Sequence, residues 1–331
     1  MPKLVAYFEL KEMRWNLDDS DVQRLRERFP GMQVVSVEDP AHVCGAIADA
    51  DIYFGFQIQR EHFLAARQLR WVHLATAGVE ENLFPEMVAS DVLLTNSTGL
   101  HSVCIPEHVL GQMFVLARSF HQTVRMQDRH EWNRWGVIAN AGGIRELNGG
   151  KLAILGAGAI GQNLARLAAC LGMTVRVMRR DASRPLAHVE RVVPPEQLKE
   201  LLGWADWIVC ALPMTAATRR IIGAEEIAAM RPDAFFINVG RGESVDEEAL
   251  ADALRRGALA GAAVDVFTQE PLPSDHPFWT LPNLVLTPHI SGYTPNYFQK
   301  MQAIFEGNLE RWVAGTALRN VVDKQLGYAR A

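Results

Sequence analysis

Residues 151–180 read KLAILGAGAIGQNLARLAACLGMTVRVMRR and contain the pattern that decides the fold. Leu152–Leu155 is a short apolar run, as expected of a parallel strand that is buried on both faces. Three glycines then follow in the order G-x-G-x-x-G. A helix is predicted from about Ile160 to Leu171, and a second strand over Thr174–Met178. A strand, glycine turn, helix and strand in this order predict a dinucleotide-binding unit.

Each glycine has its own role in such a turn. Gly156 permits the tight turn, Gly158 lets the backbone approach a pyrophosphate, and Gly161 lets the helix pack close to the strand. The helix N-terminus presents N–H groups and a positive dipole to the phosphates, so Ala159 and Ile160 belong to the predicted cofactor site. A plain glycine-rich turn is the alternative, but the flanking elements favour a nucleotide site.

The end of the second strand bears on the choice of dinucleotide. An NAD site usually has Asp or Glu about 20 residues after the motif begins. Arg179 and Arg180 stand in that place. Guanidinium groups suit a 2′-phosphate that a carboxylate would repel, so NADP(H) is favoured while NAD(H) stays possible. Asp181 could still reach a ribose, and a solvated arginine pair is the other alternative.

Composition is that of a soluble globular enzyme. The chain has 331 residues, 49% hydrophobic and 21% charged, a length that suggests two domains. The net charge of −5 does not indicate a nucleic-acid partner. No apolar run predicts a membrane span, and the N-terminus lacks a signal-peptide layout, so a cytoplasmic location is expected. The four scattered cysteines are expected to be buried small residues, with no disulfide and no metal site.

Residues 1–98 alternate predicted strands and helices, which indicates a parallel sheet covered by helices. The predicted strands are Leu4–Phe8, Val34–Val37, Ile52–Phe56, Trp71–Leu74 and Val92–Thr95, and the predicted helices are Asp18–Phe29, capped by Asp18 or Asp19, and Glu61–Gln68. His73 lies inside a strand and is expected to be a packed residue. His101 and His108 flank the start of a long helix predicted over Pro106–Ser119, where a cap or surface role is the usual one.

A turn of small residues follows the fourth of these strands. Ala77, Gly78 and Val79 expose backbone N–H groups at the carboxyl end of a strand, where open α/β sheets bind their ligands. They are predicted to cradle a substrate carboxylate, and an ordinary strand-to-helix turn is the alternative.

Four more apolar strands are predicted in the second half, and polar residues follow them. They cover Trp207–Leu212, Ala234–Val239, Ala260–Val264 and Leu284–Leu286, after a surface helix in residues 121–147 and before a last helix over Pro295–Ala314. The carboxyl ends of parallel strands meet at one edge of the sheet, which is its binding edge. Leu212, Pro213, Val239 and Gly240 are therefore predicted to lie beside the cofactor.

Three ionisable residues lie at or just beyond these strand ends. Hydride transfer between a nicotinamide and a carbonyl needs a proton donor for the oxygen, and His289 suits it because histidine titrates near neutrality. A carboxylate such as Glu270 would orient the ring and favour the imidazolium. Arg241 could grip a substrate carboxylate with two hydrogen bonds. Taken alone, each residue is more readily explained by a surface turn, a loop start or a packed side chain than by a catalytic role.

Together with GAGAIG, the segments NVGRGESVDEEAL, AAVDVFTQEPL and LTPHISGYT resemble the D-isomer specific D-2-hydroxyacid dehydrogenase family. The resemblance covers most of the chain. It implies that Arg241, Glu270 and His289 match the family's catalytic arginine, glutamate and acid/base histidine. It also implies that Asp265 binds the nicotinamide amide and that residues 77–79 form the substrate-carboxylate loop.

The resemblance further implies an α/β fold of two doubly wound parallel-sheet domains, with a Rossmann nucleotide domain inserted into a flavodoxin-like substrate domain. Residues 1–98 and 292–331 would form the discontinuous substrate domain, and residues 99–291 the dinucleotide-binding domain. Family members are typically homodimers with the active site between the domains.

The expected function is that of an NADP(H)-dependent 2-keto acid reductase acting on a small acid such as glyoxylate or hydroxypyruvate. Arg179 resembles the family's NADP-using glyoxylate/hydroxypyruvate reductase-like members. The alternatives are a dinucleotide-sensing, corepressor-like binding protein and a related dehydrogenase acting on formate or phosphite. Ser291 departs from the alanine that is usual after the histidine, and Phe54, Trp135 and Tyr293 are candidates for the pocket of the substrate side chain.

Overall fold

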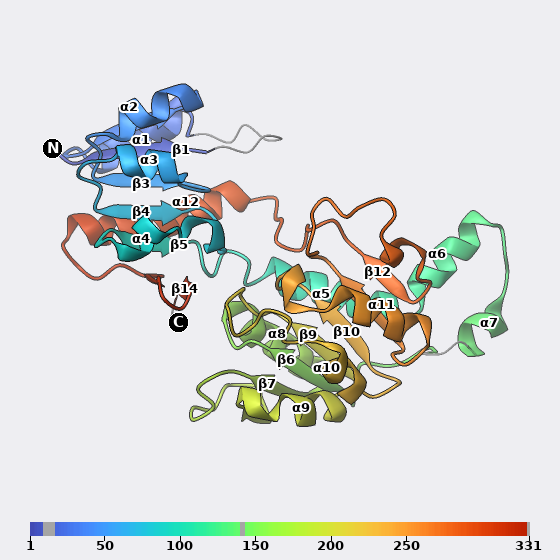
Figure 1. Cartoon of the computed structure of the whole chain (residues 1–331). Helices are drawn as coiled ribbons and strands as arrows, with labels where there is room; N and C mark the ends of the chain where they lie inside the picture. The colour runs from blue at the N-terminus through green and yellow to red at the C-terminus, as the bar shows by residue number, and fades with distance from the viewer. Residues whose placement is uncertain (9–16, 140–142, 330–331) are drawn as a thin grey trace. The chain divides into compact units, whose positions relative to one another are not determined.

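The structure is a computed structural model that describes residues 1–8, 17–139 and 143–329. The chain forms two compact units, residues 1–100 with 295–331 and residues 101–294. Each unit is built on a parallel sheet with helices packed against it (Figure 1). The predicted α/β fold class is therefore confirmed.

The first unit contains a five-stranded sheet in the order β2-β1-β3-β4-β5, which is the flavodoxin-like order. Its strands are β1 (Lys3–Tyr7), β2 (Gln33–Val37), β3 (Ile52–Gly55), β4 (Trp71–Leu74) and β5 (Leu93–Asn96). The helices of this unit are α1 (Asp19–Arg28), α2 (Val43–Ile47), α3 (Arg60–Ala65), α4 (Pro85–Ala89) and α12 (Tyr297–Val313), with the short η1 (Pro40–His42) and η2 (Glu80–Asn82) and the strand pair β13 (Val322–Asp323) and β14 (Tyr328–Ala329). Every residue of β3 and β4 is buried, because helices cover both faces.

Local rules explain where α1 begins and ends. The Asp18 side chain accepts a hydrogen bond from the N–H of Asp21 (2.8 Å), so Asp18 is the cap of the two candidates that the sequence offered. Arg26 and Arg28 lie in the last turn, where they complement the negative end of the helix dipole. The prediction for α3 was too long, because the backbone becomes extended at Ala66.

His73 is a packed residue, as predicted. It is fully buried on β4, and its Nδ1 lies 2.7 Å from the Thr95 hydroxyl oxygen. Burial lowers the pKa of His73 to about 3, so the ring is neutral at physiological pH. Phe54 is also fully buried and stacks on Phe305 with ring centroids 3.9 Å apart. The suggestion that Phe54 lines a substrate pocket is wrong, because the ring belongs to the core.

The second unit contains a seven-stranded sheet in the order β12-β11-β10-β9-β6-β7-β8. Its strands are β6 (Lys151–Leu155), β7 (Thr174–Met178), β8 (Arg191–Val193), β9 (Trp207–Cys210), β10 (Phe235–Asn238), β11 (Gly261–Val264) and β12 (Leu284–Leu286). Its helices are α5 (Cys104–Ala117), α6 (Phe120–Asp128), α7 (Arg134–Ala139), α8 (Ala159–Cys170), α9 (Leu198–Trp204), α10 (Ala224–Ala229) and α11 (Glu247–Arg255), with the short η3 (Pro195–Gln197), η4 (Gly242–Ser244) and η5 (Pro277–Thr280). The strand order reverses between β6 and β9, and this switch point is where doubly wound sheets bind ligands.

Two sequence predictions need correction in these units. The surface helix predicted within residues 121–147 is two helices, α6 and α7, and His130 between them has a φ of 56° that no helix continues through. All four cysteines were expected to be buried, but Cys44 and Cys170 are exposed and Cys104 is partly buried. Only Cys210 is buried as expected. Burial raises the pKa of the Cys210 thiol to about 11. Hydrophobicity alone did not distinguish these positions, because exposure depends on which helix face packs.

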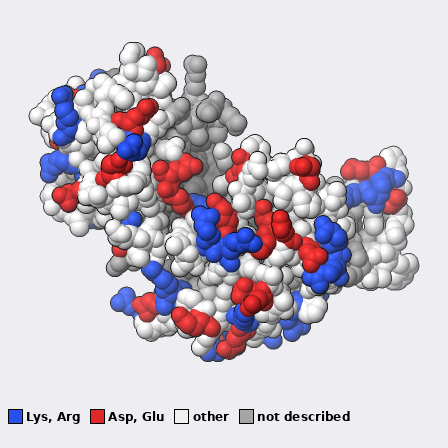
Figure 2. All heavy atoms as spheres, viewed as in Figure 1, with Lys and Arg blue, Asp and Glu red and all other residues white. Residues whose placement is uncertain are grey.

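Within the described ranges, all four cysteines are free thiols and no group of three or more His, Cys, Asp or Glu residues is arranged to hold a metal ion. A helix long and apolar enough to cross a membrane was not found in that part of the chain either. On the face shown in Figure 2, basic and acidic side chains are interspersed over both units.

Candidate active site

The glycine turn joins β6 to α8, and packing explains two of its three glycines. Gly156 has a φ of 113°, a conformation that other residues rarely adopt. A Cβ on Gly161 would lie 2.0 Å from the carbonyl oxygen of Gly156, so the helix can approach only because this residue is glycine. A Cβ on Gly158 would meet nothing within 4 Å. The protein itself therefore leaves open space above Gly158.

This open space lies at the start of a helix. Gly158 is the N-cap of α8 and offers no side-chain acceptor to the N–H groups of the first turn. Ala159 and Ile160 begin the helix at its positive dipole end. Open space and free donors at a helix N-terminus are what a pyrophosphate requires, so these residues fit a bound dinucleotide.

The strand ends next to the glycine turn carry the other predicted cofactor residues. β9 pairs with β6 and β10 pairs with β9, so their carboxyl ends share one edge of the sheet. Leu212 and Pro213 follow β9, and Val239 and Gly240 follow β10. The side chains of Leu212 and Val239 are buried in the core, which leaves backbone and the exposed Pro213 as surfaces that a ligand can reach.

Arg241 stands on a turn that approaches two neighbouring loops closely. A Cβ on Gly240 would lie 2.8 Å from the carbonyl oxygen of Leu212. A Cβ on Gly242 would lie 1.9 Å from the carbonyl carbon of Phe267. Both positions therefore need glycine, and the turn is wedged between the loops that follow β9 and β11.

Asn238, the last residue of β10, holds the same turn in place with its side chain. It is almost fully buried, and its side-chain amide donates to the carbonyl oxygen of Arg241 (3.0 Å). Its side-chain oxygen accepts from the N–H of Gly240 (3.1 Å). Sequence analysis missed this residue, although an asparagine that ends an apolar strand just before Gly-Arg-Gly was a usable signal.

Asp265 follows β11 and is fully buried. One carboxylate oxygen accepts from the Thr287 hydroxyl (2.5 Å) and the Ile290 N–H (3.0 Å), and the other accepts from the Ser291 N–H (3.0 Å). The Asp265 backbone carbonyl accepts from the N–H of His289 (2.9 Å). Asp265 therefore anchors the loop that carries His289, a role the sequence did not indicate. Its predicted contact with a nicotinamide stays a prediction.

His289 and Glu270 form the ionisable pair of this loop region. The Nδ1 of His289 lies 2.7 Å from Oε2 of Glu270, and the other carboxylate oxygen of Glu270 accepts from the N–H of Phe267 (2.9 Å). His289 has a φ of 52°, a left-handed conformation that histidine tolerates better than most residues. About half of its side chain is exposed. The ring is therefore held by one nitrogen while its surface stays accessible.

The pair shifts both pKa values in favour of the charged forms. The hydrogen bond to Glu270 raises the pKa of His289, against the opposing effect of burial. Burial raises the pKa of Glu270, but the hydrogen bonds from His289 and Phe267 outweigh it and the net shift is downward. An imidazolium beside a carboxylate is the arrangement expected of a general acid.

Two further histidines lie in this region. Nδ1 of His101 donates to the carbonyl oxygen of Gly292 (3.1 Å), and burial lowers the pKa of His101 with further lowering by the charges of Arg241 and His289. Nε2 of His108 lies 3.2 Å from the Thr287 hydroxyl oxygen. These contacts tie the start of α5 to the His289 loop, so both histidines support that loop rather than lie at a free helix end.

The loop after β7 holds the predicted dinucleotide-selecting residues. The Arg179 guanidinium donates to the backbone carbonyls of Asp181 and Arg184, the latter at 3.0 Å. The Asp181 carboxylate accepts from the hydroxyl (2.5 Å) and N–H (3.0 Å) of Ser183, which lowers the pKa of Asp181. The acid that could have reached a ribose is thus engaged in its own turn, whereas Arg180 is exposed.

The loop predicted to cradle a carboxylate lies in the first unit, after β4. The Ala77 carbonyl accepts from the Asn96 side chain (2.6 Å), which fixes the loop from the neighbouring strand. The N–H of Val79 donates to a carboxylate oxygen of Glu80 (2.8 Å). A substrate carboxylate that binds the N–H of Val79 would have to displace Glu80. The carboxylate cradle of Ala77, Gly78 and Val79 stays a prediction.

The structure thus brings Glu270 and His289 into direct contact and places Arg241 where its charge acts on His289. Of the aromatic candidates outside the core, Trp135 is 70% and Tyr293 is 55% exposed.

Comparisons with known proteins agree on one family. Residues 110–291, more than half of the chain, match the model of the "D-isomer specific 2-hydroxyacid dehydrogenase, NAD binding domain". The chain is 30% identical to glyoxylate/hydroxypyruvate reductase B of Pectobacterium carotovorum over 98% of this chain and 99% of that protein. It is also 30% identical to D-3-phosphoglycerate dehydrogenase of Methanocaldococcus jannaschii, over 92% of this chain but only 57% of that longer protein.

A solved structure supports the same relationship. The NADPH-dependent glyoxylate/hydroxypyruvate reductase of Sinorhizobium meliloti, crystallised with NADP and sulfate, superposes with a TM-score of 0.81. The two chains are 27% identical, and the match covers 99% of this chain and 100% of that one.

Alanine substitutions at Gly161 and Gly158 should have different effects on stability and on dinucleotide binding. Gly161→Ala should lower the free energy of unfolding by about 1–3 kcal/mol, because the new Cβ collides with a backbone carbonyl. Gly158→Ala should leave stability within about 0.5 kcal/mol but weaken dinucleotide binding about tenfold, because its methyl group enters space meant for the ligand. Urea denaturation and calorimetric titration with NADP⁺ measure both effects. Unchanged binding in Gly158→Ala would contradict the assignment of that space.

Proposed function

Because the chain belongs to the D-isomer specific 2-hydroxyacid dehydrogenase family, a class of NAD(P)-dependent oxidoreductases acting on CH–OH groups, we propose that it reduces a small 2-keto acid with NADPH. Glyoxylate and hydroxypyruvate are the favoured substrates. The relatives from Pectobacterium and Sinorhizobium carry those substrates in their names and match nearly the whole chain, which supports the choice.

The observation that carries this proposal is the Glu270–His289 pair. Because Nδ1 of His289 is bound to Glu270, Nε2 is the nitrogen that exchanges a proton with the substrate. The raised pKa of His289 favours the protonated ring, which is the form needed to protonate a keto oxygen during reduction.

The dinucleotide, when bound, supplies the hydride. The amides of Gly158, Ala159 and Ile160 would hold its pyrophosphate, and the strand ends after β9, β10 and β11 would line the rest of it, with Asp265 contacting the nicotinamide amide. These assignments extend the open space above Gly158 to the neighbouring strand ends of the same sheet edge.

The protein's own residues then act on the keto acid. Arg241 forms paired hydrogen bonds with the substrate carboxylate and polarises the keto oxygen. The amides of Ala77, Gly78 and Val79 stay the predicted carboxylate-binding loop of the first unit. His289 gives its Nε2 proton to the oxygen as the carbonyl carbon is reduced, and Glu270 stabilises the imidazolium until that transfer.

The pH dependence of reduction should report on His289. The imidazolium is the active form, so kcat/KM for keto acid reduction should be high at low pH and fall as pH rises through the raised pKa of His289. In Glu270→Gln this fall should occur at lower pH, because the main cause of the upward shift is removed. His289→Gln should lower kcat at least about a hundredfold while NADP⁺ still binds.

Asp275→Asn, which removes an exposed carboxylate five positions along the chain, serves as the matched control and should keep the wild-type profile. A Glu270→Gln profile that coincides with wild type would remove Glu270 from the proton-transfer pair.

The preference for NADPH rests on the loop after β7. Arg179 is oriented by two backbone carbonyls, and Arg180 follows it as an exposed residue, so this loop carries guanidinium groups of the kind that suit a 2′-phosphate. Asp181, the residue that could favour NADH, is held by Ser183. We therefore favour NADPH as the working cofactor, with NADH as the weaker one.

Arg179→Asp should lower the ratio of kcat/KM for NADPH over NADH at least about tenfold, because a cation at the 2′-phosphate becomes an anion. Arg191→Gln is the matched control, since Arg191 lies on the next strand but contacts Glu200. Initial rates with both cofactors give the ratio. If the ratio stayed at its wild-type value in Arg179→Asp, another group would set the preference.

A homodimer is the proposed assembly. Helices α6 and α7 and the loop between them present large apolar side chains to solvent in the second unit, among them Phe120, Val124, Trp132 and Trp135. Trp132 is 95% exposed, which is unusual for so large an apolar ring. A second copy of the chain is the partner that would cover this surface.

Val124→Glu should weaken self-association at least about a hundredfold, because a charge would be buried without a partner. Leu64→Glu on α3 is the matched control, since Leu64 is 53% and Val124 56% exposed. Sedimentation equilibrium measures both. Equal effects of the two substitutions, or a wild-type monomer, would argue against this surface as the dimer contact.

A further inference from the structure

A pocket lies in the first unit, at the sheet edge opposite the Ala77–Val79 loop. Its lining residues come just before or at the start of strands: Pro2 precedes β1, Met32 precedes β2, Arg70 precedes β4, and Leu93 begins β5. The end of α12 and the segment after it close the other side. The strands are parallel, so this is the amino-terminal edge, away from the carboxyl edge where the loop lies.

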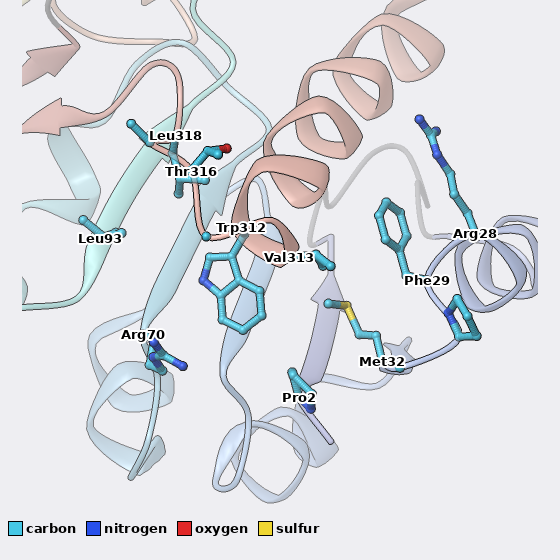
Figure 3. A pocket seen from close by; sticks show the side chains of 14 residues that line it. Pro2, Arg28, Phe29, Met32, Arg70, Leu93, Trp312, Val313, Thr316 and Leu318 are labelled. Carbon is cyan, nitrogen blue, oxygen red and sulfur yellow. The ribbon is translucent and has the colours of Figure 1, made fainter.

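The pocket has the size and composition of a small-molecule site. Its volume is about 760 Å³, within the range of ligand pockets in proteins. Most of the lining is apolar, and Figure 3 shows Trp312 in the middle of it, with Arg70 on one side and Phe29, Met32 and Pro2 on the other. Such a surface accepts a flat apolar body.

The charged side chains of the lining indicate which charge a bound ligand would carry. Arg28 and Arg70 are the only charged side chains among the described lining residues. Arg28 is already paired with Glu306 and Glu310. For the Arg70 guanidinium the described chain offers neither a carboxylate nor a hydrogen-bond acceptor, and its contact is with the Trp312 ring, 5.4 Å from the centroid. A cation without a carboxylate partner at an apolar wall favours a ligand with a negative charge.

The contact of Arg70 with Trp312 suits the guanidinium to a planar anion such as a carboxylate. A guanidinium that lies over an aromatic ring has its planar donors held in one orientation and suited to a planar carboxylate. The remaining lining would contact the body of the ligand through carbon atoms. We propose that this pocket binds a small aromatic carboxylate, whose charge pairs with Arg70 and whose ring packs on Phe29, Met32 and Trp312.

The proposal does not depend on the proposed function. The pocket belongs to the first unit alone, and the glycine turn belongs to the second. The residues that line the pocket are therefore different from those proposed to hold the dinucleotide. Binding can be measured on the full chain saturated with NADP⁺, whether or not any keto acid is turned over.

The test is calorimetric titration of the NADP⁺-saturated protein with 2-naphthoate. We expect one saturable site, weakened at least about tenfold by Arg70→Gln because the paired hydrogen bonds are lost. The control Arg67→Gln removes an exposed arginine three positions earlier that lies outside the lining, and should bind as wild type. The neutral 2-naphthylmethanol should bind at least about tenfold more weakly than the carboxylate.

A second variant keeps the test valid if Arg70→Gln is unstable. Leu93→Glu places a carboxylate in the lining at a residue that is 43% exposed, and it should also weaken 2-naphthoate binding about tenfold. No binding at millimolar concentration, equal loss in Arg67→Gln, or equal affinity for the alcohol would overturn the proposal. So would a change of oligomeric state in Arg70→Gln, since the pocket would then be a contact between copies.

Discussion

The buried carboxylate of Asp265 is the constraint on which the candidate site depends. A carboxylate in a protein interior is tolerated only when its oxygens are hydrogen-bonded, and here three donors of one loop supply those bonds. The Asp265 carbonyl holds the N–H of His289 as well. Because this loop cannot leave Asp265 without exposing unsatisfied polar groups, His289 is held in its left-handed conformation, with Nδ1 against Glu270.

The rest of the sheet edge depends on backbone segments that approach one another closely. Glycine is required at Gly156 and Gly161 so that α8 can begin directly above β6, and at Gly240 and Gly242 so that the Arg241 turn fits between two loops. Four positions without side chains thus place a helix N-terminus and a guanidinium at one edge. Gly158 differs, because the protein does not fill the space above it, and an open position in so crowded an edge is the clearest sign of a ligand.

The sequence was informative where local rules act. The glycine spacing, the apolar strands and the Asp18 cap depend on neighbours in the chain, and the fold class was predicted correctly from them. Contacts between distant residues were not predictable. Nothing local indicates that Phe54 stacks on Phe305, or that Asp265 accepts hydrogen bonds from the N–H groups of Ile290 and Ser291. The roles of Arg241, Glu270 and His289 came from resemblance, and their chemistry stays a prediction.

The central claim is that Arg241, Glu270 and His289 reduce a 2-keto acid with hydride from NADPH. The most direct measurement is NADPH and NADH oxidation, followed by absorbance, against glyoxylate, hydroxypyruvate and pyruvate, with the configuration of any chiral product determined by chiral chromatography. The account predicts faster turnover with NADPH, on glyoxylate or hydroxypyruvate, and a D-configured product wherever the product is chiral. Tight dinucleotide binding without turnover of any keto acid by either cofactor would contradict it.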